Sequence, residues 1–164
     1  MIRALFLLLL ASPAMADGTL EGRLVNFSVL VYDDPARPIF VGQGRTVQVG
    51  QGVEFGLDRE GAQNGVDVVP VAVDISPQRI EVEFLPGVQG ELLTAAFNGY
   101  VLHFETDCAL FEKVGIDREF TTMAMTDADI QTEVSTLFIN MSGKTFVPGQ
   151  GFGLNVQVAD CPLS

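Results

Sequence analysis

The chain has 164 residues, with 21 acidic and nine basic side chains and a formal net charge of −12. Nucleic-acid partners are excluded on this basis, because phosphate backbones are bound by clusters of Lys and Arg side chains. The length suits a single domain.

Residues 1–16 have the pattern of a signal peptide. Arg3 gives a positive start, Ala4–Ala11 form an apolar run, and Ala14-Met15-Ala16 supplies the small residues of a cleavage site. A short membrane anchor is the alternative, but the run is well below the roughly 20 residues of a spanning helix. We therefore expect export to the periplasm or the medium, no membrane span, and one mature domain over residues 17–164. That domain has eight basic and 21 acidic residues, a net charge of −13.

Strands are predicted where apolar and polar residues alternate, because successive side chains of a strand point to opposite faces. In Ile80–Phe84, for example, the apolar side chains share one face and both carboxylates share the other. The predicted strands cover residues 20–32, 46–49, 53–57, 71–75, 80–84, 99–105, 120–126, 137–141 and 154–158. A single helical turn is allowed at 109–114 or at 127–131.

Turn residues separate these segments, and Asn98-Gly99 is predicted to be a hairpin turn because both residues tolerate positive φ. Short strands at this spacing indicate an all-β fold. We predict an antiparallel two-sheet sandwich, similar to a jelly roll, with eight to ten strands.

Two cysteines, Cys108 and Cys161, each follow the end of a predicted strand. In an exported chain such a pair is expected to form a disulfide. The bond would close a long loop and contribute roughly 4 kcal/mol in the chain-entropy model. A metal site that uses these two cysteines as ligands is disfavoured, because the chain has one His and no third thiol to complete the ligand set.

Three segments carry a family resemblance: Val49-Gly50-Gln51-Gly52-Val53-Glu54-Phe55, Phe97-Asn98-Gly99-Tyr100-Val101-Leu102, and Ile139-Asn140-Met141-Ser142-Gly143-Lys144-Thr145-Phe146. Their order, over roughly residues 18–158, resembles an exported bacterial β-domain of PEP-CTERM or VPLPA-CTERM sorted proteins. Those proteins carry a C-terminal sorting tail and are associated with bacteria that produce exopolysaccharide. This chain departs from them by lacking the tail and by carrying the cysteine pair. The resemblance supplies no catalytic residues.

Acidic clusters raise the question of calcium, which takes six to eight oxygen ligands from Asp, Glu and Asn side chains. The candidate ligands fall in two segments: Asp58, Glu60, Asn64 and Asp67 in the first, and Asp127, Asp129 and Glu133 in the second. In the second segment, Gln131-Thr132 stands where a calcium loop has its third ligand and glycine. We interpret both segments as solvated loops, with no cofactor, and keep calcium as the alternative.

No catalytic constellation is evident. His103 is the single histidine, and no Gly-x-Ser-x-Gly motif supplies a nucleophile beside it. We therefore expect a structural or surface role for His103. Sugar stacking would need exposed aromatic faces, but the chain has no Trp and two tyrosines, Tyr32 and Tyr100, and its phenylalanines are expected in the core.

The leading hypothesis is thus a non-enzymatic exported module for binding, adhesion or matrix structure, with extracellular polysaccharide or an envelope protein as the partner. The alternative is a hydrolase or lyase that acts on extracellular polysaccharide through acidic residues. Two carboxylates converging in a deep cleft would favour the enzyme, and acids scattered over sheet faces would favour the module.

Overall fold

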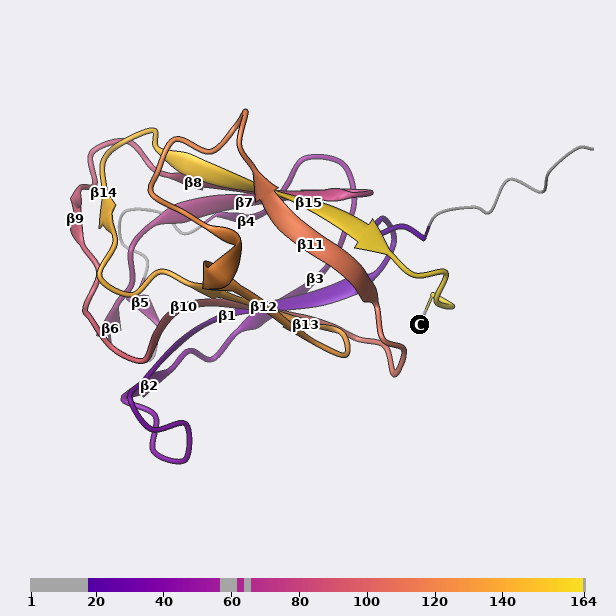
Figure 1. The fold of residues 1–164 in the computed structure, drawn as a ribbon, viewed down its shortest axis with the longest axis horizontal. Coiled ribbons are helices and arrows are strands. Elements are labelled where there is room, and N and C mark those ends of the chain that lie inside the picture. The colour runs from indigo at the N-terminus through magenta and orange to yellow at the C-terminus, as the bar shows by residue number, and fades with distance from the viewer. Residues whose placement is uncertain (1–17, 57–61, 64–65, 164) are drawn as a thin grey trace, which may run out of the picture.

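The computed structural model describes residues 18–56, 62–63 and 66–163, and these form an antiparallel β-sandwich (Figure 1). The first sheet has the order β12-β13-β10-β1-β2, and β3 also pairs with β1. The second sheet has the order β11-β15-β8-β7-β4. The predicted all-β, two-sheet fold is confirmed.

The strands of the first sheet are β1 (Leu24–Tyr32), β2 (Phe40–Val41), β3 (Arg45–Gln48), β10 (Phe97–Phe104), β12 (Ile130–Glu133) and β13 (Thr136–Asn140). Those of the second are β4 (Val53–Gly56), β7 (Val71–Ser76), β8 (Arg79–Phe84), β11 (Phe111–Asp117) and β15 (Gly151–Val158). Two small ribbons, β9 (Gly90–Glu91) with β14 (Thr145–Phe146) and β5 (Ala62–Gln63) with β6 (Val66–Asp67), lie at one end of the sandwich.

The core lies between the two sheets and is built by the predicted alternation. In β1 every second residue is buried, from Val25 to Val31, and β7 and β8 behave in the same way. In β15 the alternation holds from Leu154 to Val158, after a start in which all residues are buried. Within the described residues, ten strands have four or more residues, and five further strands of two residues each bring the number above the predicted eight to ten. The alternation therefore identifies the long strands, while the two-residue strands are too short to show a period.

The predicted hairpin at Asn98-Gly99 is wrong, because both residues lie inside β10. Gly99 pairs with Leu30 on one side and Asn140 on the other. A Cβ atom on Gly99 would lie 1.9 Å from the carbonyl oxygen of Ile139. This glycine is therefore required for the close approach of β10 and β13. Close approach of another backbone is one of the known reasons for a glycine within a strand.

Two other predicted elements need correction. Residues 109–114, where a helical turn was allowed, belong largely to β11 (Phe111–Asp117), which pairs with β15. Residues 120–126, predicted to be a strand, instead form a loop over β15, where Thr121 Oγ1 accepts a hydrogen bond from Gly153 N. The allowed turn at 127–131 is a 3₁₀ turn over Asp127–Asp129, followed by β12.

The predicted disulfide is present. Cys108 and Cys161 are bonded, with their Cα atoms 6.0 Å apart. Beside the bond, the buried Arg23 side chain donates hydrogen bonds to the carbonyl oxygens of Cys161 (2.7 Å) and Pro162 (3.2 Å). The segment that follows β15 is therefore fastened to the core both covalently and by a buried guanidinium.

We predict that Gly99→Ala destabilises the fold by about 1–3 kcal/mol or more, because the added methyl group forces β10 and β13 apart. Gly50→Ala is the matched control, since a Cβ at Gly50 meets no atom within 4 Å. Urea unfolding of the two variants measures the difference. Equal midpoints for both would contradict the close approach.

Removal of the disulfide by Cys161→Ser should lower the free energy of unfolding by about 2–4 kcal/mol without changing the fold. Cys108→Ser should have the same effect, and the double variant should lose little more than either single one, because one bond is at stake. Denaturant unfolding and thiol labelling check this. Two single-variant effects that simply add, or native protein that labels at both positions, would argue against the bond.

Tyr100 is fully enclosed in the core, and burial raises the pKa of its hydroxyl well above the ordinary value of about 10. Because only the unfolded chain ionises near that value, stability is complete below about pH 10 and falls as the pH rises further. In a Tyr32→Phe variant, where Tyr100 is the single tyrosine, we expect no tyrosinate absorbance from the folded protein between about pH 9 and 11. Its appearance in the folded state would show that Tyr100 is accessible.

Candidate functional site

Aromatic side chains gather on the outer face of the first sheet, away from the core. Tyr32 of β1 stacks on Phe97 of β10, with ring centroids 5.4 Å apart. Phe138 of β13 meets Phe97 edge to face at 6.1 Å. The paired registers of β1, β10 and β13 place all three rings on the face opposite the buried Val31 and Leu102. Phe97 is buried beneath its neighbours, with 6% of its surface exposed, whereas Phe138 is half-buried on the outer face, so the expectation that the phenylalanines belong to the core is wrong for Phe138.

These rings form one side of a surface hollow of about 330 Å³, which we call the aromatic hollow. Its described lining consists of apolar side chains and two exposed polar ones on β12: Leu30, Tyr32, Pro35, Pro38, Phe97 and Phe138, with Gln131 and Glu133. Aromatic faces next to a few polar groups are typical of a ligand site. Glu133, a predicted calcium ligand, thus lies at this hollow.

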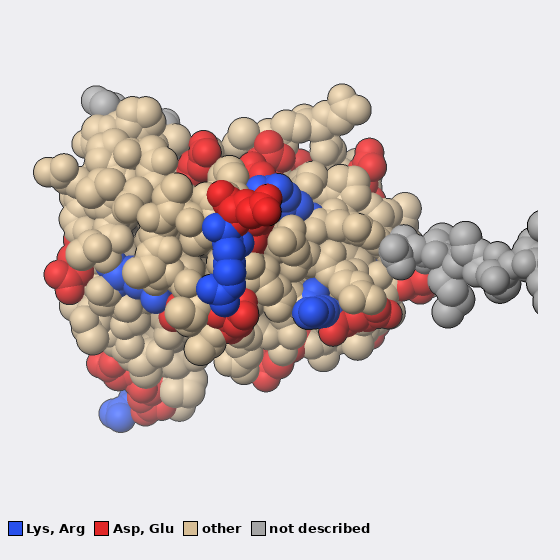
Figure 2. Space-filling view, turned by 45° about the horizontal axis from the view of Figure 1, so that its top comes forward, with Lys and Arg blue, Asp and Glu red and all other residues tan. Residues whose placement is uncertain are grey.

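The second sheet carries a different depression on its outer face, a polar groove of about 640 Å³. Its described lining includes Ser76, Gln78, Arg79, Lys113, Asp127, Asn155 and Gln157. On the face drawn in Figure 2, basic and acidic side chains touch near the centre. The groove is therefore lined by amides and charges rather than by apolar rings.

Two carboxylates meet beside this groove, but an arginine lies between them. Arg79 binds Glu81 through Nε at 2.7 Å and Asp117 through a terminal nitrogen at 2.8 Å. The second oxygen of Asp117 accepts hydrogen bonds from the backbone of Glu119 and Phe120. A glycosidase needs two carboxyl groups that flank an open substrate site, and this pair is instead closed by a guanidinium.

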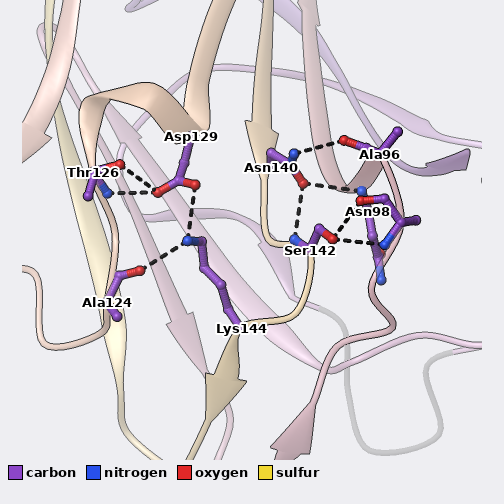
Figure 3. A network of polar contacts seen from close by, with 9 residues as sticks. Ala96, Asn98, Ala124, Thr126, Asp129, Asn140, Ser142 and Lys144 are labelled. Atoms are coloured by element: carbon purple, nitrogen blue, oxygen red, sulfur yellow. Dashed lines mark hydrogen bonds and ion pairs between the residues drawn. The ribbon is translucent and has the colours of Figure 1, made fainter. Parts of the chain in front are cut away.

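In the second segment of candidate calcium ligands, Asp127 and Asp129 interact with other groups of the protein (Figure 3). One oxygen of Asp129 pairs with Lys144 Nζ at 3.0 Å, and the other accepts hydrogen bonds from Thr126. Asp127 accepts a hydrogen bond from Ile116 N at 2.9 Å and faces Arg118 at 3.8 Å. The structure therefore does not bring Asp127, Asp129 and Glu133 together as ligands.

The first calcium segment is only partly within the described residues. Asp58, Glu60 and Asn64 lie outside them, and of Asp67 the structure describes its place in β6 alone. Across residues 18–56, 62–63 and 66–163, no group of three or more His, Cys, Asp or Glu side chains is arranged to hold a metal ion.

The segments that carry the family resemblance have structural roles. Asn140 accepts hydrogen bonds from the backbone of Asn98 and Ser142 and donates one to the carbonyl oxygen of Ala96. Ser142 Oγ donates to the carbonyl oxygen of Ala95 at 2.7 Å. These side chains join the end of β13 to the start of β10 (Figure 3). Glu54 similarly accepts hydrogen bonds from Gly50 N and Ile75 N.

His103 lies exposed on the outer face of β10, as expected, and its Nδ1 is 2.8 Å from Thr136 Oγ1. The partner described for the ring is a hydroxyl group, whereas a catalytic histidine is oriented by a carboxylate. Sequence reasoning placed this residue correctly but missed the aromatic hollow. The sequence does contain a signal for the hollow: both faces of β1 are apolar near its end, with Leu30 and Tyr32 on one face and Val29 and Val31 on the other.

No helix within the described residues is long and apolar enough to cross a membrane. Comparison with protein-family models, with curated proteins and with solved structures gives no significant match.

Proposed function

We propose that this chain is an exported, non-enzymatic module that binds a neutral extracellular polysaccharide in the aromatic hollow. The observation that carries the proposal is the placement of the half-buried Tyr32 and Phe138 rings on the outer face of the first sheet, where both pack against the buried ring of Phe97. Export is supported by the signal-peptide pattern of residues 1–16 and by the Cys108–Cys161 disulfide.

The hollow matches the two kinds of surface that a sugar ring offers. The C–H faces of a sugar are apolar and pack against aromatic rings, and its edge carries hydroxyl groups that need hydrogen-bond partners. Tyr32 and Phe138 are half-buried, so part of each side chain remains in contact with solvent. Gln131 and Glu133 lie exposed beside these rings and supply a planar amide and a carboxylate for hydroxyl groups.

Charge favours a neutral polymer over an anionic one. Residues 17–164 carry a net charge of −13, which repels polyanions as they approach. The charged group among the described residues of the hollow is the carboxylate of Glu133. The resemblance to exported domains from exopolysaccharide-producing bacteria supports an extracellular polysaccharide as the partner.

The alternative, a polysaccharide hydrolase or lyase, would use the polar groove of the second sheet, where acidic and amide side chains occur together. The ion pairs of Arg79 with Glu81 and Asp117 speak against it, because both carboxylates would have to leave the guanidinium before they reach a substrate. Release of reducing ends from any polysaccharide by the purified chain would favour this alternative.

Affinity electrophoresis in gels that contain dextran, mixed-linkage β-glucan or galactomannan tests the binding proposal. We expect at least one polymer to retard the protein, and Tyr32→Ala to weaken its binding about three- to tenfold, the range of an aromatic contact. Gln131→Ala should also weaken binding, because its amide lies at the hollow.

Gln157→Ala is the matched control, since it removes the same side chain from the polar groove of the other sheet. It should leave retardation unchanged. A protein that no polymer retards, or equal retardation of the Tyr32→Ala variant and the parent, would overturn the proposal.

A further inference from the structure

A second hollow adjoins the outer face of the first sheet, and we call it the histidine hollow. Its volume is about 650 Å³. His103, near the end of β10, lines it from the sheet. The rest of its lining comes from the segment that follows β10 and from the segment that follows β15, and includes Thr106, Asp107, Cys108, Pro162 and Leu163.

The histidine hollow and the aromatic hollow are neighbours on this face, with Thr136 between them. Phe138, which lines the aromatic hollow, is two residues from Thr136 on β13, so the two side chains share a face. Thr136 lies opposite His103 in the pairing of β13 with β10, and its Oγ1 is 2.8 Å from His103 Nδ1. On its other side, Thr136 pairs with Glu133 of the aromatic hollow. The two hollows therefore adjoin on one continuous sheet face.

Together the two hollows are long in the direction of the strands. Phe97, at the start of β10, lines the aromatic hollow, and His103, six residues later on the same strand, lines the histidine hollow. Six residues of a strand cover about 20 Å. A single sugar ring is much shorter than this and would occupy one hollow only. The face has room for several linked sugar units.

The histidine hollow offers the same two kinds of contact as the aromatic hollow. Leu163 supplies an apolar surface that is 60% exposed, and Thr106 and Asp107 supply a hydroxyl group and a carboxylate. The contact with Thr136 orients the His103 ring, and its Nε2 makes no hydrogen bond with any residue that the structure describes. No Lys or Arg of the described residues lines either hollow, so an acidic polymer finds no counter-charge there.

We propose that the polysaccharide lies along both hollows, so that the site takes a chain segment of several sugar units rather than a single unit. One unit packs against the rings of Tyr32 and Phe138, and a later unit of the same chain meets His103 and Leu163. His103 Nε2 forms a hydrogen bond with a hydroxyl group of that later unit. This inference rests on the proposed function, because it extends the same site.

Calorimetric titration with matched disaccharides and hexasaccharides tests the length of the site. The probes are isomaltose with isomaltohexaose for dextran, cellobiose with cellohexaose for β-glucan, and mannobiose with mannohexaose for galactomannan. For the polymer that retards the protein, we expect one hexasaccharide to bind per chain, about tenfold or more tightly than the disaccharide. The added affinity comes from contacts in the histidine hollow.

Variants of the histidine hollow should reduce this advantage of the longer ligand. His103→Ala should lower the ratio of hexasaccharide to disaccharide affinity about three- to tenfold, the value of one hydrogen bond. Leu163→Ser should lower the same ratio, and its exposed position makes an effect on folding small. Tyr32→Ala should weaken the binding of both ligands. Gln48→Ala is the matched control, because it removes an exposed polar side chain of the same sheet from outside both hollows, and it should bind like the parent.

Two results would overturn the extended site alone. They are equal affinities of the parent for the hexasaccharide and the disaccharide, and a His103→Ala variant that binds the hexasaccharide like the parent. Retardation by the polymer, and its loss in Tyr32→Ala, would remain intact in both cases, so the aromatic hollow would stand without the extension. A protein that binds no polymer and no oligosaccharide would overturn the proposed function and the extended site together.

Discussion

The antiparallel pairing of β1 with β10 is the constraint on which the rest of the structure depends. The two strands pair over eight residue positions, from Val25 with Phe104 to Tyr32 with Phe97. This register decides which side chains face the core and which face solvent, and a slip by one residue would exchange the two sets. The proposed binding site uses it, because Leu30 and Tyr32 of β1 and Phe97 of β10 line the aromatic hollow.

The same pairing explains why one short stretch of sequence serves two surfaces. Val31 pairs with Asn98 on the core side, and Tyr32 pairs with Phe97 on the outer side. Gly99, the residue after Asn98, lets β13 approach closely enough to bring Phe138 beside the outer rings. Residues of β10 that follow one another in the chain are thus divided between the outer aromatic hollow and the core.

Much of the fold could be predicted from the sequence, because apolar and polar residues alternate strictly in a sandwich strand that has one face in the core and one in solvent. Ile80–Phe84 and Leu154–Val158 are such strands, and the cysteines after strand ends were correctly paired. Alternation no longer identifies a strand where both of its faces are buried or where both are exposed to solvent. β10 has apolar residues on both faces and so shows no clear alternation, and its Asn98-Gly99 pair has the residue types of a hairpin turn although it lies within the strand. β11 interrupts its alternation with Glu112-Lys113 and an irregular register against β15.

The candidate sites were harder to predict, because period two shows that a strand has two faces and does not show which face meets the other sheet. Phe97 and Phe138 therefore looked like core residues. The register of β1 and β10 is the claim to test, and nuclear Overhauser effects measure it directly, since the two tyrosines give separate ring signals. The account predicts contacts from the Tyr32 ring to Phe97 and from the Tyr100 ring to Val29. Contacts from the Tyr100 ring to Leu30, with none between Tyr32 and Phe97, would contradict it.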